Sequence, residues 1–277
     1  MDFATIIGLA IAFGAVAVSA FIGKVDVSIL FRQYEAFILV FGGTLGATMI
    51  SFPMRTFLNS MKTGVIVAFK KPQYNEREIV ARLVSFAEKA RREGLLALEQ
   101  ETTDLNDDFL RKGVQLVIDG RDTDIIRQIL ETEVSFVRER RAKAEAVFTT
   151  MGGYSPTLGI IGTVLGLIAM LKGLGSMGSG GGTGSIGIAT AQAFVATFYG
   201  ILLANLLWLP IAGKIKERNS QLTLLREIMI EGILSIQAGD NPRLVEEKLH
   251  AFLDPDDLKK VDEEDDGVMA AEPSFQS

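Results

Sequence analysis

Hydrophobic residues along this chain gather in four long stretches instead of being spread evenly. Each stretch holds about 17 to 25 residues, which as an α-helix is enough to cross the hydrocarbon of a bilayer. None of them contains an acidic residue or a histidine. The pattern therefore predicts four membrane-spanning helices, over residues 3–23, 36–52, 147–171 and 188–212.

Between and after these stretches the pattern changes to that of amphipathic helices. Apolar residues recur at spacings of three and four from Ile79 to Ala90, with charged residues between them. Gly94 and Gly120 should end helices. A helix that starts near residue 122 should continue into the third span, because no breaker separates the two. We therefore expect an all-α integral membrane protein with four transmembrane helices and a mostly helical cytoplasmic domain.

Five segments are expected in chain order. They are a first transmembrane hairpin, a cytoplasmic helical domain running into the third helix, a second transmembrane hairpin, a cytoplasmic helical tail and an acidic disordered tail. Their predicted bounds are 1–52, 53–146, 147–212, 213–253 and 254–277. The glycine-rich stretch between the third and fourth spans is typical of a flexible linker, and it lacks the Gly-Lys-Ser/Thr of a phosphate loop.

Basic residues are distributed unevenly around the spans. Seventeen of the 28 lysines and arginines lie in residues 53–146 and eight follow residue 212, against two in 24–35 and one in 172–187. By the positive-inside rule the two basic regions are cytoplasmic. Both termini should therefore lie in the cytoplasm.

The third span carries a stripe of small and hydroxyl residues. At about 100° per residue, Pro156, Gly159, Thr163, Gly166 and residue 170 share one face of a helix. Lipid-facing stripes are rich in Leu, Ile and Phe, so this face should contact another helix or water. Gly162 and Gly166 add a GxxxG spacing on the adjoining side.

The fourth span repeats the theme with Thr197, Gly200 and Pro210. At ~1.5 Å per residue Thr163 and Thr197 come to a similar depth, near the middle of the membrane. Two threonines at one depth on antiparallel helices would line a polar path. The alternative is that each hydroxyl bonds the carbonyl four residues back in its own helix.

Composition excludes several function classes. The net charge of −6 argues against nucleic acid as a partner, and the chain has no cysteine and one histidine. No catalytic constellation or metal-ligand spacing is present, so we expect neither an enzyme nor a cofactor. An ion pathway usually needs an intramembrane carboxylate or histidine, which the spans lack. If this protein moves ions, a partner must bring that group.

Three segments resemble one known family. PTLGIIGTVLGLIAML in the third span, ATFYGILLAN in the fourth and KARREGLLALE in the insert are similar to the flagellar motor stator A subunit, the MotA/PomA family. The resemblance covers nearly the whole chain. It implies a bacterial inner-membrane protein that forms a pentameric ring around two B-type subunits (MotB/PomB), each with a membrane aspartate and a peptidoglycan-binding domain. Ion flow through that complex would drive torque on the rotor protein FliG.

The resemblance also assigns roles to individual residues. It implies that Pro156 and Pro210 couple ion passage to conformational change, that Arg91 and Glu99 meet the rotor, and that the two threonines lie beside the ion path. For Arg91 and Glu99 the alternative is an ordinary solvated helix face. Hydroxyl oxygens suit Na⁺, a hard cation, which favours Na⁺ slightly over H⁺.

Two other readings stay open. A TolQ/ExbB-like protein would drive envelope transport, although those relatives have three spans and this chain predicts four. A passive scaffold or transporter without rotary output is the other. A neighbouring gene for a protein with one membrane aspartate and a peptidoglycan-binding domain would favour the stator.

Overall fold

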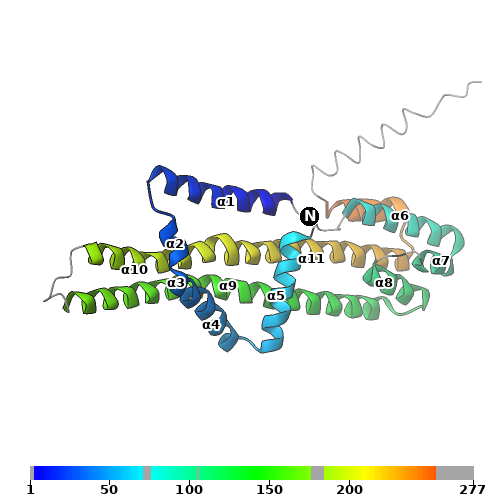
Figure 1. The fold of residues 1–277 in the computed structure, drawn as a ribbon. Helices are drawn as coiled ribbons and strands as arrows, with labels where there is room; N and C mark the ends of the chain where they lie inside the picture. Colours follow the sequence, from blue (N-terminus) through cyan, green and yellow to red (C-terminus); the bar gives the residue numbers. More distant parts are fainter. Residues whose placement is uncertain (1–2, 71–75, 104, 106, 176–183, 254–277) are drawn as a thin grey trace, which may run out of the picture. The chain divides into compact units, whose positions relative to one another are not determined.

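The computed structural model describes residues 3–70, 76–103, 105, 107–175 and 184–253. Its described residues are almost entirely helical (Figure 1). Four helical segments are long and apolar enough to cross a membrane, which confirms the predicted fold class: Phe3–Ile22, Tyr34–Ser51, Thr123–Gly173 and Ala193–Ala238. Most of the predicted glycine-rich linker and the whole predicted acidic tail, 254–277, lie outside the described residues.

The chain packs as two units. The first comprises residues 1–72 and 139–219, and the second comprises 73–138 and 220–277. The boundaries expected between membrane and cytoplasmic segments, at residues 52, 146 and 212, concern membrane topology and stay predictions.

The first unit begins with helices that the apolar pattern describes only in part. α1 (Phe3–Ile22) corresponds to the first span, and a short α2 (Ser28–Arg32) follows it. The second span is three consecutive segments, α3 (Tyr34–Phe37), a π-helical η1 (Ile38–Gly42) and α4 (Gly43–Ser51). Pro53 follows the end of the span, and α5 (Met54–Phe69), which the pattern did not single out, begins directly after it.

Two long helical segments each contribute one part to this unit and the remainder to the second unit. α9 (Thr123–Gly175) is one unbroken helix, as the absence of a breaker predicted. α10 (Gly184–Leu203), a π-helical η4 (Ala204–Trp208) and α11 (Leu209–Ala238) follow one another without a break. Within the first unit the buried core gathers around Phe148 and Trp208, whose ring centroids lie 6.4 Å apart.

The second unit is a helical bundle with its own apolar core. It contains α6 (Glu76–Glu93), the 3₁₀ turn η2 (Leu95–Ala97), α7 (Leu98–Thr103), α8 (Asp108–Ile118) and α12 (Pro242–His250), with the adjoining ends of α9 and α11. Its fully buried side chains include Leu83, Leu110, Ile126, Leu130 and Ile233.

Local signals in the sequence explain several boundaries of this bundle. Gly94 and Gly120 end α6 and α8 with positive φ angles of 88° and 68°, as glycine readily does. Asp107 caps α8 by accepting hydrogen bonds from the backbone N–H groups of Phe109 and Leu110 at 2.8 and 3.1 Å. Asn241 caps α12 in the same way.

Candidate functional site

Two threonine hydroxyls meet where α9 and α10 lie side by side (Figure 1). Thr163 and Thr197 share a hydrogen bond although they lie 34 residues apart in the chain. The Thr163 hydroxyl is also 3.1 Å from the carbonyl oxygen of Ala193 and 3.2 Å from that of Gly159. The Thr197 hydroxyl lies 3.4 Å from the same Gly159 oxygen. Two hydroxyl and two carbonyl oxygens therefore gather at one point of contact.

Both possibilities that the spacing left open occur here. Thr163 keeps a bond to the carbonyl four residues back, and it also reaches the other helix. Thr197 bonds across to α9. In the second span, by contrast, the buried Thr44 and Thr48 donate to the carbonyls four residues back, at 2.6 and 2.7 Å. The Thr163–Thr197 pair thus differs from an ordinary intrahelical arrangement.

Glycines let the backbones of α9 and α10 approach this closely. A Cβ atom added at Gly200 would lie 2.7 Å from the backbone oxygen of Ser155, and one at Gly159 would lie 2.9 Å from that of Ala196. Both distances are too short for real Cβ atoms, and the obstructing atoms belong to the backbone. Any side chain at either position would push the two helices apart.

The GxxxG pair serves the same contact. A Cβ at Gly162 would lie 2.5 Å from the methyl carbon of Ala196, and one at Gly166 would lie 2.8 Å from that of Ala193. The expectation that this stripe contacts another helix is therefore met by α10 of the same chain. Ala193 and Ala196 were not singled out from the sequence, although their spacing to Gly200 extends a small-residue stripe along α10.

The two predicted coupling prolines lie on α9 and α11. Pro156 has no N–H, so the carbonyl of Gly152 loses its usual helical donor. Gly152 packs against Leu209, since a Cβ there would lie 2.4 Å from a methyl carbon of that leucine. Leu209 directly precedes Pro210, which follows the π-helical η4. The helices that carry the two prolines therefore touch one residue before Pro210 and four before Pro156.

One polar group beside Pro156 is buried without a partner. The Ser155 hydroxyl is fully buried and has no hydrogen-bond acceptor or donor among the described residues. Such a group is costly unless something satisfies it in another state or assembly. The sequence carried no signal for it, because a serine in a membrane helix commonly bonds its own backbone.

The predicted rotor contacts lie in the second unit. Arg91 is in the last turn of α6 and Glu99 in the first turn of α7, and both side chains are exposed. Neither belongs to an ion pair with any described residue, whereas nearby Lys89 and Glu101 pair at 2.6 Å. Leu96, which lies between them in sequence, is 72% exposed. Both charges are therefore exposed and available for electrostatic contact with another molecule.

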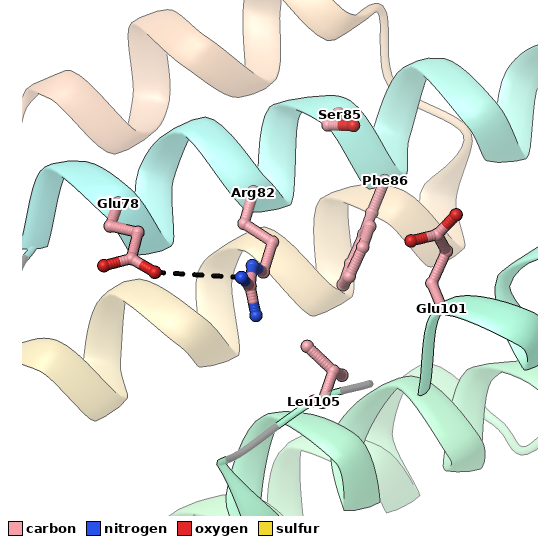
Figure 2. Close-up of a pocket in the computed structure, with 6 residues that line it drawn as sticks. All are labelled: Glu78, Arg82, Ser85, Phe86, Glu101 and Leu105. Carbon is pink, nitrogen blue, oxygen red and sulfur yellow. Dashed lines mark ion pairs between the residues drawn. The ribbon is translucent and has the colours of Figure 1, made fainter. Parts of the chain in front are cut away.

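A shallow pocket of about 350 Å³ lies elsewhere in the second unit. Figure 2 shows Arg82 and Phe86 projecting from α6 toward Leu105, with Glu78 on the same helix 3.7 Å from Arg82. Its charges are mixed and solvent-exposed, so the ion pair contributes little. Among the described residues no cluster of His, Cys, Asp and Glu could hold a metal ion.

A family model described as the MotA/TolQ/ExbB proton channel family matches residues 101–228. The chain is 37% identical over 265 residues to motility protein A of Bacillus subtilis (strain 168), covering 95% of each chain. It is 34% identical over 255 residues to chemotaxis protein PomA of Vibrio alginolyticus, covering 91% of this chain and 96% of that protein.

Two solved structures have the same fold along nearly their full length. A chain of the flagellar MotAB stator complex from Bacillus subtilis matches with a TM-score of 0.86 and 37% identity, covering 94% of this chain and 99% of that one. A chain of C. jejuni MotAB matches with a TM-score of 0.85 and 29% identity, covering 92% and 97%. With relatives above 30% identity over almost its whole length, the chain belongs to the motility protein A group of the MotA/TolQ/ExbB family.

Proposed function

We propose that this chain is a subunit of a flagellar motor stator, which couples inward ion flow to torque on the rotor. The observation that carries the proposal is the match to a solved flagellar stator complex over 94% of this chain and 99% of its counterpart. A fold alone does not establish a function. Here, however, the likeness of fold is accompanied by 37% sequence identity.

The chain would work with a B-type partner subunit and further copies of itself. No apolar stretch of this sequence contains a carboxylate or a histidine, whereas an ion path through a membrane usually needs one. In the proposed assembly, five copies surround a dimer of the partner, whose membrane aspartate carries the ion. The whole complex lies in the inner membrane with both termini of this chain in the cytoplasm.

The four-oxygen cluster around Thr163 and Thr197 is the proposed neighbour of the ion path. Hydroxyl and carbonyl oxygens are ligands that hard cations prefer, and both threonines are half-buried. This supports Na⁺ slightly over H⁺ as the coupling ion. Neutralising the partner's aspartate beside this cluster would change which packing of the ring around the dimer is favoured.

Torque would reach the rotor through the second unit. At a membrane potential of about 150 mV, each charge that crosses supplies about 3.5 kcal/mol, enough to bias a two-state step strongly. The Gly152–Leu209 contact beside Pro156 and Pro210 is the proposed bending point. Arg91 and Glu99 would then exchange charge contacts with FliG.

The test is complementation of a strain that lacks the gene for this chain. Pro156→Ala and Arg91→Glu should each abolish swimming, while membrane fractionation shows that the protein still inserts. Arg92→Glu is the matched control for the second, because Arg92 is the adjacent exposed cation of α6. Normal swimming with Pro156→Ala or Arg91→Glu would contradict the assigned roles.

Loss of the gene also separates the stator from the envelope-transport alternative. A TolQ/ExbB-like energiser would leave swimming intact and impair the envelope. The ion follows from swimming speed measured across sodium concentrations and again with a proton uncoupler. A swimming speed that decreases as external sodium is lowered supports Na⁺. A speed that does not depend on sodium but is abolished by the uncoupler supports H⁺.

A further inference from the structure

An apolar cavity of about 600 Å³ lies within the first unit, between α1, α5 and the start of α11. Gly8 and Ala12 line it from α1, Val65 from α5, and Trp208 and Ile211 from the end of η4 and the start of α11. Its volume is within the ~300–1,000 Å³ typical of ligand pockets. None of the proposed coupling threonines lines it.

One edge of this cavity is polar and carries a cation. The Lys214 ammonium donates hydrogen bonds to the Thr5 hydroxyl and, at 3.4 Å, to the carbonyl oxygen of Ala68. All three residues line the cavity, and none of its described lining residues is acidic. Lys214 is also the first charged residue after the fourth apolar stretch, which places this edge at the membrane boundary.

The Trp208 side chain adds a second polar feature. It lines the cavity and is 5% exposed, and its Nε1–H is buried with no acceptor among the described residues. Tryptophan at a membrane boundary commonly presents an apolar ring to the chains of lipids and its N–H to a polar group.

The free space itself is created by small residues. A Cβ at Gly8 would meet nothing within 4 Å, and alanines occupy neighbouring positions of the α1 lining. An extended acyl chain has no polar group of its own to satisfy, so it suits this largely apolar space. Basic pockets between membrane helices on the cytoplasmic side bind anionic lipid headgroups.

We propose that this cavity binds one anionic phospholipid of the cytoplasmic leaflet. Its acyl chain lies along α1 and α5, and its phosphate accepts hydrogen bonds from Lys214 and Thr5. The lipid fills the space between α1 and the rest of the first unit, which matters because α1 has no buried residue of its own. It thereby anchors α1 to the remainder of this unit.

The test is native mass spectrometry of the purified complex of this chain with its B-type partner. The complex is titrated with phosphatidylglycerol or with phosphatidylcholine of matched acyl chains. Lys214→Gln removes the cation, and Gly8→Phe fills the space. The matched controls are Lys216→Gln, an exposed cation of α11, and Gly14→Phe, a glycine of α1 that also meets nothing within 4 Å and does not line the cavity.

The wild-type complex should retain phosphatidylglycerol in preference to phosphatidylcholine. Lys214→Gln should weaken that retention about 5-fold, since a cation near an anionic surface is worth about 1 kcal/mol. Gly8→Phe should abolish it, and both controls should behave as wild type. Equal retention of the two lipids, or unchanged phosphatidylglycerol retention in both test variants, would overturn the proposal. A change of subunit number in Gly8→Phe, with lipid retention unaltered, would assign the cavity to a contact between copies and would also overturn it.

Discussion

Replacing Gly200 by alanine tests whether the close approach of α9 and α10 builds the site. The added Cβ would lie 2.7 Å from the Ser155 oxygen and 3.1 Å from the Cα atoms of Gly159 and Pro156. Ordinary contact begins at 3.4 Å, so the helices must separate by about 0.7 Å (3.4 minus 2.7). All three obstructing atoms are backbone atoms, which leaves no flexible side chain to move instead.

That separation would break the oxygen cluster. If it is transmitted in full, the 3.1 Å contact from Thr163 to the Ala193 oxygen grows to about 3.8 Å, beyond hydrogen-bond range. Overpacking of this kind costs about 1–3 kcal/mol, against a gain of up to about 1 kcal/mol from the better helix propensity of alanine. The balance is a loss of stability, accompanied by impaired motility.

Two other glycines provide matched controls. Gly153 on α9 and Gly213 on α11 have nothing within 4 Å of an added Cβ, so alanine there should leave stability equal or higher. Equilibrium unfolding in mixed detergent micelles, followed by circular dichroism, measures the stability of each variant, and swimming assays measure function. Gly200→Ala that equals Gly153→Ala in both assays would refute the argument from helix approach.

Three further predictions concern single contacts. Thr163→Val removes a hydroxyl from the oxygen cluster while keeping the side-chain volume, so a sodium-driven motor should need several-fold more sodium for half-maximal swimming speed. Thr163→Ser keeps the hydroxyl and should leave the sodium requirement unchanged. An unchanged sodium requirement in the valine variant would show that Thr163 does not lie beside the ion path. Gly94→Ala places a side chain at φ 88° and ψ 163°, a backbone region open almost only to glycine. Despite the open space around this position, the change should lower the free energy of chemical unfolding by about 1–3 kcal/mol. A free energy equal to that of the wild type would contradict this, because it would show that the turn relaxes. The hydrogen bond from Lys248, 2.7 Å long, holds the pKa of Asp240 below its ordinary 3.8 and the pKa of Lys248 above its ordinary 10.5. The pair should therefore stabilise the protein between pH 3.8 and pH 10.5. This stabilisation should be lost as pH falls through the lowered pKa of Asp240 or rises through the raised pKa of Lys248. Asp240→Asn should therefore cost about 0.2–1 kcal/mol near neutral pH, because water still reaches both side chains of the pair. It should cost less near pH 2, and a penalty that does not vary with pH would contradict the ion-pair assignment.

The sequence alone determined the class of protein and most of its helices. Four apolar stretches without acidic residues clearly indicate membrane-spanning helices. In lipid a backbone must satisfy its own hydrogen bonds, and few structures besides a helix allow that. The continuous α9 followed from the lack of any breaker between residue 122 and the third span, and Gly94 and Gly120 marked helix ends through the backbone geometry open to glycine. These signals act over a few residues, so they can be read in order along the chain.

Only the tertiary structure decided which helix the small-residue face of α9 contacts. Periodicity placed Thr163 and Gly166 on one face, but choosing α10 as the partner depends on backbones meeting at distances set by both helices together. The bond between Thr163 and Thr197 joins residues 34 positions apart, and the cavity beside Lys214 is bounded by segments from α1, α5 and α11. The π-helical turns at Ile38–Gly42 and Ala204–Trp208 likewise had no sequence signal, because their hydrogen-bond pattern is selected by packing against neighbours and not by the local residues.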